Sequence, residues 1–279
     1  MRRLFAIFGF AIVAVFSAVA IPAQGSPKPS PVAVRVRSLM LVSPELTPGD
    51  CMRMESLFRG KRYVPEELQE RVRLALRDEG FYKAKVGPAQ ILHRTGRAES
   101  IYADFRFKVM PGARYRLAGI RFVGVSSFSK DPLVFPLDQL RAQFHVADGD
   151  LFRASAITEG LGNLNRLYAT SGYIDFAGIL RAEVDEGRHT VALTIEADRG
   201  KRFYFSRLFL DGVEPHAGDA AALFDAWGNL KGRPYNPDAV GRWLASYAPY
   251  WPDEREAMRH ISTMQHPETQ LIDVRLDLP

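Results

Sequence analysis

Histidine is the side chain best suited to hold a metal ion or to transfer a proton near neutral pH, and the chain contains 6 of them. His260 and His266 are the closest pair, but they flank a predicted strand, so their side chains would point apart across a turn. The spacing therefore predicts no metal site. The other histidines are scattered over predicted turns and strand ends: His93, His145, His189 and His216.

Nucleophiles and paired carboxylates show no catalytic pattern either. Cys51 is the only cysteine; an idle thiol is the ordinary interpretation, and an intermolecular disulfide is the alternative. The carboxylates of Asp253, Glu254 and Glu256 suit the start of a helix. No serine has the context of a nucleophile elbow, and no glycine-rich loop leads from a strand into a helix. We therefore expect no catalytic residue, no metal and no cofactor.

The composition is that of an ordinary globular protein, with 47% hydrophobic and 25% charged residues over 279 positions. The net charge of +5 is small and dispersed, so it does not predict nucleic-acid binding. Basic residues gather in Arg71–Arg77, which we interpret as a solvated helix face. Contact with an anionic membrane surface is the alternative.

The N-terminus has the pattern of an export signal. Met1-Arg2-Arg3 is followed by the apolar run Leu4–Ala20, which ends in Ala-Val-Ala. This pattern predicts a signal peptide, residues 1–20, that is cut before Ile21; an uncleaved inner-membrane anchor is the alternative. Residues 21–31 then form a proline-rich linker, and the body of the protein lies in the periplasm.

A repeat organises the rest of the chain. Gly112–Gly124 returns as Gly200–Gly212, and 200 − 112 and 212 − 124 are both 88. A repeat of this length corresponds to one small domain. Three segments also show the apolar–polar alternation of a strand with one buried face. Their apolar positions are Ile101, Ala103, Phe105, Phe107 and Val109; Val191, Leu193, Ile195 and Ala197; and Ile272, Val274, Leu276 and Leu278.

Each of these strands follows a stretch with apolar residues at helical spacing. The three apolar stripes are Leu68, Val72 and Leu76; Ile157, Leu161, Leu164 and Tyr168; and Val240, Trp243, Leu244 and Tyr247. The predicted start signals are Pro65-Glu66-Glu67, Ser155 as an N-cap, and Asn236-Pro237-Asp238, and Gly80 and Gly172 close the first two helices. Shorter helices are predicted upstream, over Thr47–Phe58, Pro136–His145 and Asp219–Trp227.

Each unit then reads strand, helix, helix, strand, strand. In the middle unit the strands are Tyr115–Val125, Ala177–Val184 and His189–Ala197, and a hairpin over Asp185–Arg188 joins the last two. We predict an α+β fold of three tandem units, each with a three-stranded mixed sheet covered by two helices on one face. The units span residues 32–113, 114–202 and 203–279.

The middle unit carries a family resemblance. GDLFRASAITEGLGNLNRLYATSGYIDF, Gly149–Phe176, resembles the Gly-x-x-aromatic, helix, Leu-x-x-Leu-Tyr and Gly-Tyr run of POTRA (polypeptide-transport-associated) domains. These are the periplasmic modules of outer-membrane barrel-assembly and secretion proteins. Shorter forms recur at Gly60–Tyr63 with Asp78–Val86, and at Gly232–Val240; the third unit has Tyr247–Ala257 in place of the Gly-Tyr element. The resemblance implies that the second strand of each unit is an exposed edge: Lys85–His93, Ala177–Val184 and His260–Gln265.

The resemblance further implies a periplasmic protein-interaction scaffold that assists outer-membrane protein assembly or secretion by binding at sheet edges. Its expected partners are an outer-membrane barrel protein or other envelope assembly protein, and unfolded client peptides. Nucleic acid is not expected, and membrane contact is peripheral or absent. Because the chain ends at Pro279, directly after the third terminal strand, we expect a scaffold without a barrel of its own. The predicted partner-binding residues are Gly178, Ile179, Leu180, Arg181, Ala182 and Glu183, together with Trp243, Tyr250 and Trp251 in the aromatic-rich third unit.

Two other functions stay open. An FtsQ-type membrane-anchored scaffold of the cell envelope or divisome would require the leader to remain as an anchor, and three units in place of one count against it. A periplasmic enzyme or small-ligand binder would require a convergent set of polar side chains, which the sequence does not suggest.

Overall fold

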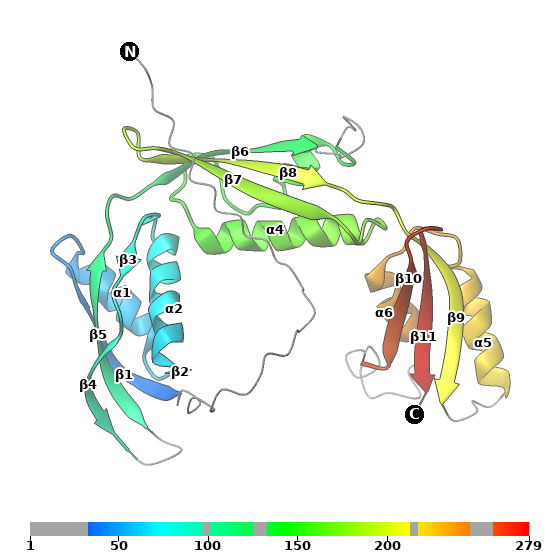
Figure 1. The fold of residues 1–279 in the computed structure, drawn as a ribbon, viewed down its shortest axis with the longest axis horizontal. Coiled ribbons are helices and arrows are strands. Elements are labelled where there is room, and N and C mark those ends of the chain that lie inside the picture. Colours follow the sequence, from blue (N-terminus) through cyan, green and yellow to red (C-terminus); the bar gives the residue numbers. More distant parts are fainter. Residues whose placement is uncertain (1–32, 97–100, 125–132, 213–216, 246–258, 279) are drawn as a thin grey trace, which may run out of the picture. The chain divides into compact units, whose positions relative to one another are not determined.

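The computed structural model describes residues 33–96, 101–124, 133–212, 217–245 and 259–278. They form three tandem modules, each a β-sheet with helices on one face (Figure 1), which confirms the predicted α+β class. By spatial grouping the chain divides into two compact bodies. The first comprises Met1–Arg121, Phe144–Glu159 and Leu180–Thr194, and the second comprises Phe122–Gln143, Gly160–Ile179 and Ile195–Pro279. The division passes through the sheet of the central module.

The N-terminal module contains more strands than predicted. Its strands are β1 (Val34–Val42), β2 (Arg62–Tyr63), β3 (Lys85–Val86), β4 (Gln90–Thr95) and β5 (Tyr102–Met110), in the order β2-β1-β5-β3, with β4 also paired to β5. β1 and β5 are parallel, whereas β3 and β4 run antiparallel to β5. The single edge strand predicted over Lys85–His93 is therefore divided. Gly87 and Pro88 interrupt it, since proline has no N–H to donate to a strand ladder.

Two helices, α1 (Pro48–Phe58) and α2 (Pro65–Asp78), cover this sheet. α1 begins with a capping box, in which the Asp50 amide donates to Thr47 Oγ1 (3.2 Å) and the Thr47 amide donates to Asp50 Oδ2 (3.1 Å). The apolar stripe of α2 is buried as predicted, and so are the alternating residues of β5. Together they form the core: Leu68, Val72, Leu76, Ala103, Phe105, Phe107 and Val109.

The central module consists of β6 (Arg116–Gly124), α3 (Leu137–Arg141), α4 (Ala154–Ala169), β7 (Ala177–Asp185) and β8 (Thr190–Asp198), with sheet order β6-β8-β7. Along β8, buried and half-buried residues alternate as predicted. The prediction of Ser155 as the N-cap is wrong, because α4 begins one residue earlier. The Ser155 amide instead donates to Asp78 Oδ1, 2.7 Å away at the end of α2, so a carboxylate from another helix satisfies this helix start.

The C-terminal module consists of β9 (Tyr204–Gly212), α5 (Ala217–Gly228), α6 (Pro237–Ala245), β10 (Ile261–His266) and β11 (Leu271–Leu278). The sheet order is β10-β11-β9; β11 is parallel to β9 and antiparallel to β10. As predicted, Asn236 begins α6, because its Oδ1 accepts from the amides of Asp238 (2.9 Å) and Ala239 (3.2 Å). Tyr247, predicted at the end of the helical stripe, lies outside the described residues.

The Gly-x-x-aromatic motif performs the same task in all three modules. Its glycine has a positive φ, where a residue with a Cβ is strained: 78° at Gly60, 89° at Gly149 and 78° at Gly232. Each glycine amide donates to a carbonyl of the first strand, at Val36 (2.8 Å), Leu117 (2.7 Å) and Phe205 (2.9 Å). The motif therefore returns the chain alongside the first strand before the second helix begins.

Candidate functional site

The outer strand of the central sheet carries most of the predicted binding residues. Gly178–Glu183 all lie on β7, which occupies an outer position in the order β6-β8-β7. Exposed and half-buried residues alternate along β7, and the Ile179 side chain is 48% exposed. Among the described strands β7 therefore pairs on one side only, and the backbone N–H and C=O groups of its other side could pair with an added strand.

The strands that precede the last strand of the other two modules share this character. β4 and β10 are both outer strands, and each exposes large apolar side chains. Ile91 and Leu92 on β4 are 43% and 46% exposed, and Met264 on β10 is 58% exposed. An outer strand with apolar side chains can contact both the backbone and the side chains of an extended peptide.

Trp243 offers little of its surface to a partner. This side chain is only 6% exposed and packs edge-to-face on Trp227, with ring centroids 5.2 Å apart. It belongs to the core of the C-terminal module, and its role in partner binding stays a prediction. The sequence pattern could not separate the two roles, because Trp243 lies on the apolar stripe of α6. Tyr250 and Trp251 lie outside the described residues.

A buried carboxylate holds the edge strand β10 in the C-terminal sheet. Asp273 on β11 accepts from the Arg207 amide (2.9 Å) and from Arg207 Nη2 (2.8 Å), and its Oδ2 lies 2.9 Å from His266 Nε2 on β10. The register between β9 and β11 shifts at this point, so the bulge directs the Arg207 side chain at Asp273. Burial opposes ionisation, but these hydrogen bonds outweigh it and hold the pKa of Asp273 well below its usual range.

The N-terminal sheet repeats this arrangement. Arg37 lies where the register between β1 and β5 shifts, and its Nε donates to Asp104 Oδ1 at 2.8 Å. Ser38 Oγ donates to the same oxygen at 2.7 Å. Hydrogen bonds from Arg37 and then Ser38 hold the pKa of Asp104 well below its usual range. His93 on β4 pairs in register with Asp104, so in both modules a histidine of the edge strand lies near the carboxylate.

Acid should weaken the C-terminal module through Asp273. A carboxyl whose pKa is lowered by folding stabilises the native state above its unfolded value, here 3.8, and this contribution is lost as pH falls toward the native pKa. Tryptophan fluorescence can follow urea unfolding, because the 3 tryptophans lie at Trp227, Trp243 and Trp251. We expect the urea midpoint to fall between about pH 5 and pH 2. Asp273→Asn should lower the midpoint at pH 7 and flatten this dependence, whereas exposed Asp277→Asn should not. Equal pH slopes in both variants would contradict the assignment.

The first repeat copy begins at a contact with the end of α2, within the first body. The Tyr115 amide donates to the Gly80 carbonyl (2.8 Å). The Arg114 guanidinium lies 4.7 Å from the centre of the Phe81 ring, a cation–π contact. Arg114 Nη2 also donates to buried Asp50 (2.7 Å). Burial opposes ionisation of Asp50, but hydrogen bonds to Thr47 and the nearby guanidinium charges hold its pKa below the usual range.

The second repeat copy forms an equivalent contact within the second body. The Phe203 amide donates to the Gly172 carbonyl (2.8 Å), and the Arg202 guanidinium lies 5.5 Å from the centre of the Tyr173 ring. Arg114 and Arg202 are 88 positions apart, as are Tyr115 and Phe203. The repeat therefore specifies a strand and also the contact of its start with the end of the preceding helix, which we call a junction. Sequence reasoning missed this role, although the shared Gly-x-Arg-aromatic start of the two copies is its signal.

A hydrogen-bonded tyrosine reinforces the first junction. Tyr115 Oη donates to Glu186 at 2.6 Å, and Lys83 pairs with the same carboxylate. Burial and then the bond to Glu186 raise the pKa of Tyr115 to about 12. The bonds from Lys83 and Tyr115 lower the pKa of Glu186. The hairpin predicted over Asp185–Arg188 thus contacts the start of its own module's first strand.

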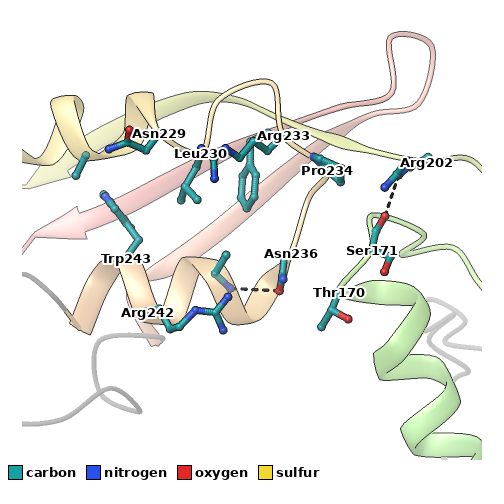
Figure 2. Close-up of a pocket in the computed structure, with 13 residues that line it drawn as sticks. Thr170, Ser171, Arg202, Asn229, Leu230, Arg233, Pro234, Asn236, Arg242 and Trp243 are labelled. Atoms are coloured by element: carbon teal, nitrogen blue, oxygen red, sulfur yellow. Dashed lines mark hydrogen bonds between the residues drawn. The ribbon is translucent and has the colours of Figure 1, made fainter. Parts of the chain in front are cut away.

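A cleft of about 630 Å³ lies within the second body. Figure 2 shows that its walls come from the segment after α4, from the loop before α6 and from α6 itself. Arg202, Arg233 and Arg242 line it, together with the amide side chains of Asn229 and Asn236. No sequence motif predicts this cleft, because its residues come from separate turns and helix ends.

The described residues contain no group of acidic, histidine and cysteine side chains that could hold a metal ion. Within the same described part of the chain, no helix combines the length and the hydropathy needed to cross a bilayer. Cys51 is half-buried, and burial, followed by the charge of Asp50, raises the pKa of its thiol. This shift disfavours the reactive thiolate.

Comparison with known proteins identifies the central module. The family model of POTRA, described as "Surface antigen variable number repeat", matches residues 115–200. Among solved structures, POTRA3-5 of BamA from Haemophilus influenzae superposes with a TM-score of 0.58 at 17% identity, covering 91% of this chain and 99% of that one. POTRA1-3 of Omp85 from Anabaena gives a TM-score of 0.34 at 14% identity, covering 89% and 96%. A search of curated protein sequences finds no match.

Proposed function

We propose that this chain, in which residues 115–200 are a POTRA domain, is a periplasmic protein-interaction scaffold for outer-membrane protein assembly or secretion. The role is non-catalytic. The proposed modules span residues 32–113, 114–202 and 203–279, behind an export signal at 1–20 and a linker at 21–31. The observation that carries the proposal is that the strand before the last strand of each module lies at an outer position of its sheet: β4, β7 and β10.

Edge pairing accounts for how such a scaffold would recognise many clients. An outer strand presents backbone donors and acceptors that an extended peptide can satisfy with little demand on its sequence. The exposed side chains of Ile179 and Met264 would favour peptides with alternating apolar residues, such as strands that have not yet joined a sheet. The proposed partners are therefore unfolded client segments and an outer-membrane barrel or other envelope assembly protein.

A photocrosslinking experiment tests the edge directly. Photoreactive residues at Ile179 and Glu183 on β7 are compared with the same residues at Glu159 and Asn165, which are exposed on α4. The probe is a short peptide of alternating valine and threonine, with a proline-containing version as control. We expect crosslinks from β7 alone, and only to the peptide without proline. Crosslinks confined to α4 would contradict edge pairing and indicate a helix surface.

A proline substitution provides the second test. Leu180→Pro removes one N–H from β7 and obstructs an added strand. Because outer strands tolerate proline better than central ones, the variant should retain its thermal midpoint to within a few degrees while losing about tenfold in peptide affinity. The matched control is Leu193→Pro on the central strand β8, where proline should unfold the module. Full peptide binding by folded Leu180→Pro would rule out β7 as the capture strand.

A further inference from the structure

The cleft in the second body has an unusual distribution of charge. Three arginines line it, Arg202, Arg233 and Arg242, and none of the other described residues that line it is a carboxylate. Among the residues that the structure describes, Arg233 and Arg242 form no ion pair. Asp238 is the acidic residue of α6, but it pairs with Arg166 of α4 (3.2 Å). Three positive charges that line one cleft would attract an anionic ligand.

One of the three arginines is already positioned. Arg202 Nε donates to the carbonyl of Ser171 (3.0 Å), and its guanidinium also contacts the Tyr173 ring. Figure 2 shows Arg202 beside Ser171 on one wall, while Arg233 and Arg242 come from the loop and from α6. A guanidinium donates in a planar fork that matches two oxygens of one oxyanion. The cleft therefore combines one arginine fixed by its neighbours with two exposed ones that can close on a ligand.

The cleft also has an apolar floor. Phe205 and Trp243 line it and are nearly buried, and Leu230 beside them is half-buried. A free inorganic anion would occupy the arginines but leave this floor uncovered. A bilayer surface is broad, whereas the floor is recessed. The chemistry thus favours a ligand that carries a carboxylate next to an apolar side chain.

We propose that this cleft binds an acidic polypeptide segment, with a glutamate or aspartate held by Arg233 and Arg242 and an adjacent apolar side chain packed over Leu230 and Trp243. The inference rests on the proposed scaffold function only in taking a polypeptide as the ligand. It adds a second mode of recognition, in which the cleft contacts side chains of the bound polypeptide, whereas an edge strand pairs with the backbone of the polypeptide.

Calorimetric titration with two peptides tests the proposal. One alternates phenylalanine and glutamate, and the other replaces every glutamate by glutamine, which keeps the shape and removes the charge. We expect the glutamate peptide to bind the full-length protein at least about tenfold more tightly. Arg233→Gln with Arg242→Gln should abolish this preference. Arg233→Lys with Arg242→Lys should restore part of it, because lysine restores the positive charge but lacks the planar guanidinium that donates two parallel hydrogen bonds.

The matched control removes two other charges from the same region. Lys201 and Lys231 are exposed neighbours that do not line the cleft, so Lys201→Gln with Lys231→Gln should retain the preference. An equal loss in this control would overturn the proposal in favour of general attraction. Displacement of the peptide by inorganic phosphate, or arginine-dependent binding of phosphatidylglycerol vesicles in place of the peptide, would also overturn it. Leu180→Pro should leave the glutamate peptide's affinity unchanged, which separates failure of this inference from failure of edge pairing.

Discussion

Replacing Phe105 with Asp is expected to unfold the N-terminal module. Phe105 is fully buried on β5, and its ring stacks on Phe107 with centroids 6.3 Å apart. The substitution removes a large apolar side chain from the core and places a carboxylate there without a partner, which together cost roughly 4 kcal/mol or more. Hydrogen exchange measured by mass spectrometry should show loss of protection across β5 and across β1 and β4, which both pair with it.

The control is Lys108→Asp, three positions along the same strand. Lys108 is exposed on the opposite face of β5, so its replacement should leave exchange protection nearly unchanged, within about 0.5 kcal/mol. It is a better control than Arg106, whose Nε is buried. Similar exchange in the two variants would show that the alternation along β5 does not define the core.

Gly172→Ala is the second substitution with a large expected effect. Gly172 has a φ of 94°, and a Cβ built on it would lie 2.7 Å from the carbonyl oxygen of Phe203. The alanine variant must therefore move Phe203, which is buried in the core of the C-terminal module, or break the hydrogen bond that joins them. Left-handed strain and the clash together should cost about 3 kcal/mol. Urea unfolding followed by tryptophan fluorescence measures the loss.

The contrast is with Gly232→Ala. Gly232 also has a positive φ, 78°, but nothing lies within 4 Å of its added Cβ. This variant isolates the conformational penalty, so we expect a loss of only about 1 kcal/mol. If Gly232→Ala cost as much as Gly172→Ala, the close approach to Phe203 would contribute nothing to stability.

The sequence predicted the helices and strands whose buried face follows from the spacing of their apolar residues. The alternation from Ala103 to Val109 and from Val191 to Ala197 placed two central strands with their buried faces correct. Leu68, Val72 and Leu76 placed the buried face of α2. These signals are strong because each depends on burial of one face along a single element.

The errors and omissions arise where a second element decides the outcome. Asp78 supplies the hydrogen-bond acceptor at the start of α4 that was expected from the Ser155 hydroxyl. Trp243 packs on Trp227 from another helix, so its burial could not be read from α6 alone. The arginine cleft is assembled from residues after α4, before α6 and on α6. The spacing of residues along one segment does not indicate which other segments they contact. The binding roles of the edge and cleft residues are proposals that the binding experiments test.

The paired junctions couple the end of one module's helix to the first strand of the next module. At each one, the acceptor is a carbonyl at the end of a helix, Gly80 or Gly172, and the donor is the amide of Tyr115 or Phe203, just before the first strand of the following module. Fraying of α2 would thus release β6, and fraying of α4 would release β9. In a linear array coupled only between neighbours, a local defect at one junction would therefore loosen the adjoining module before it reached the module beyond.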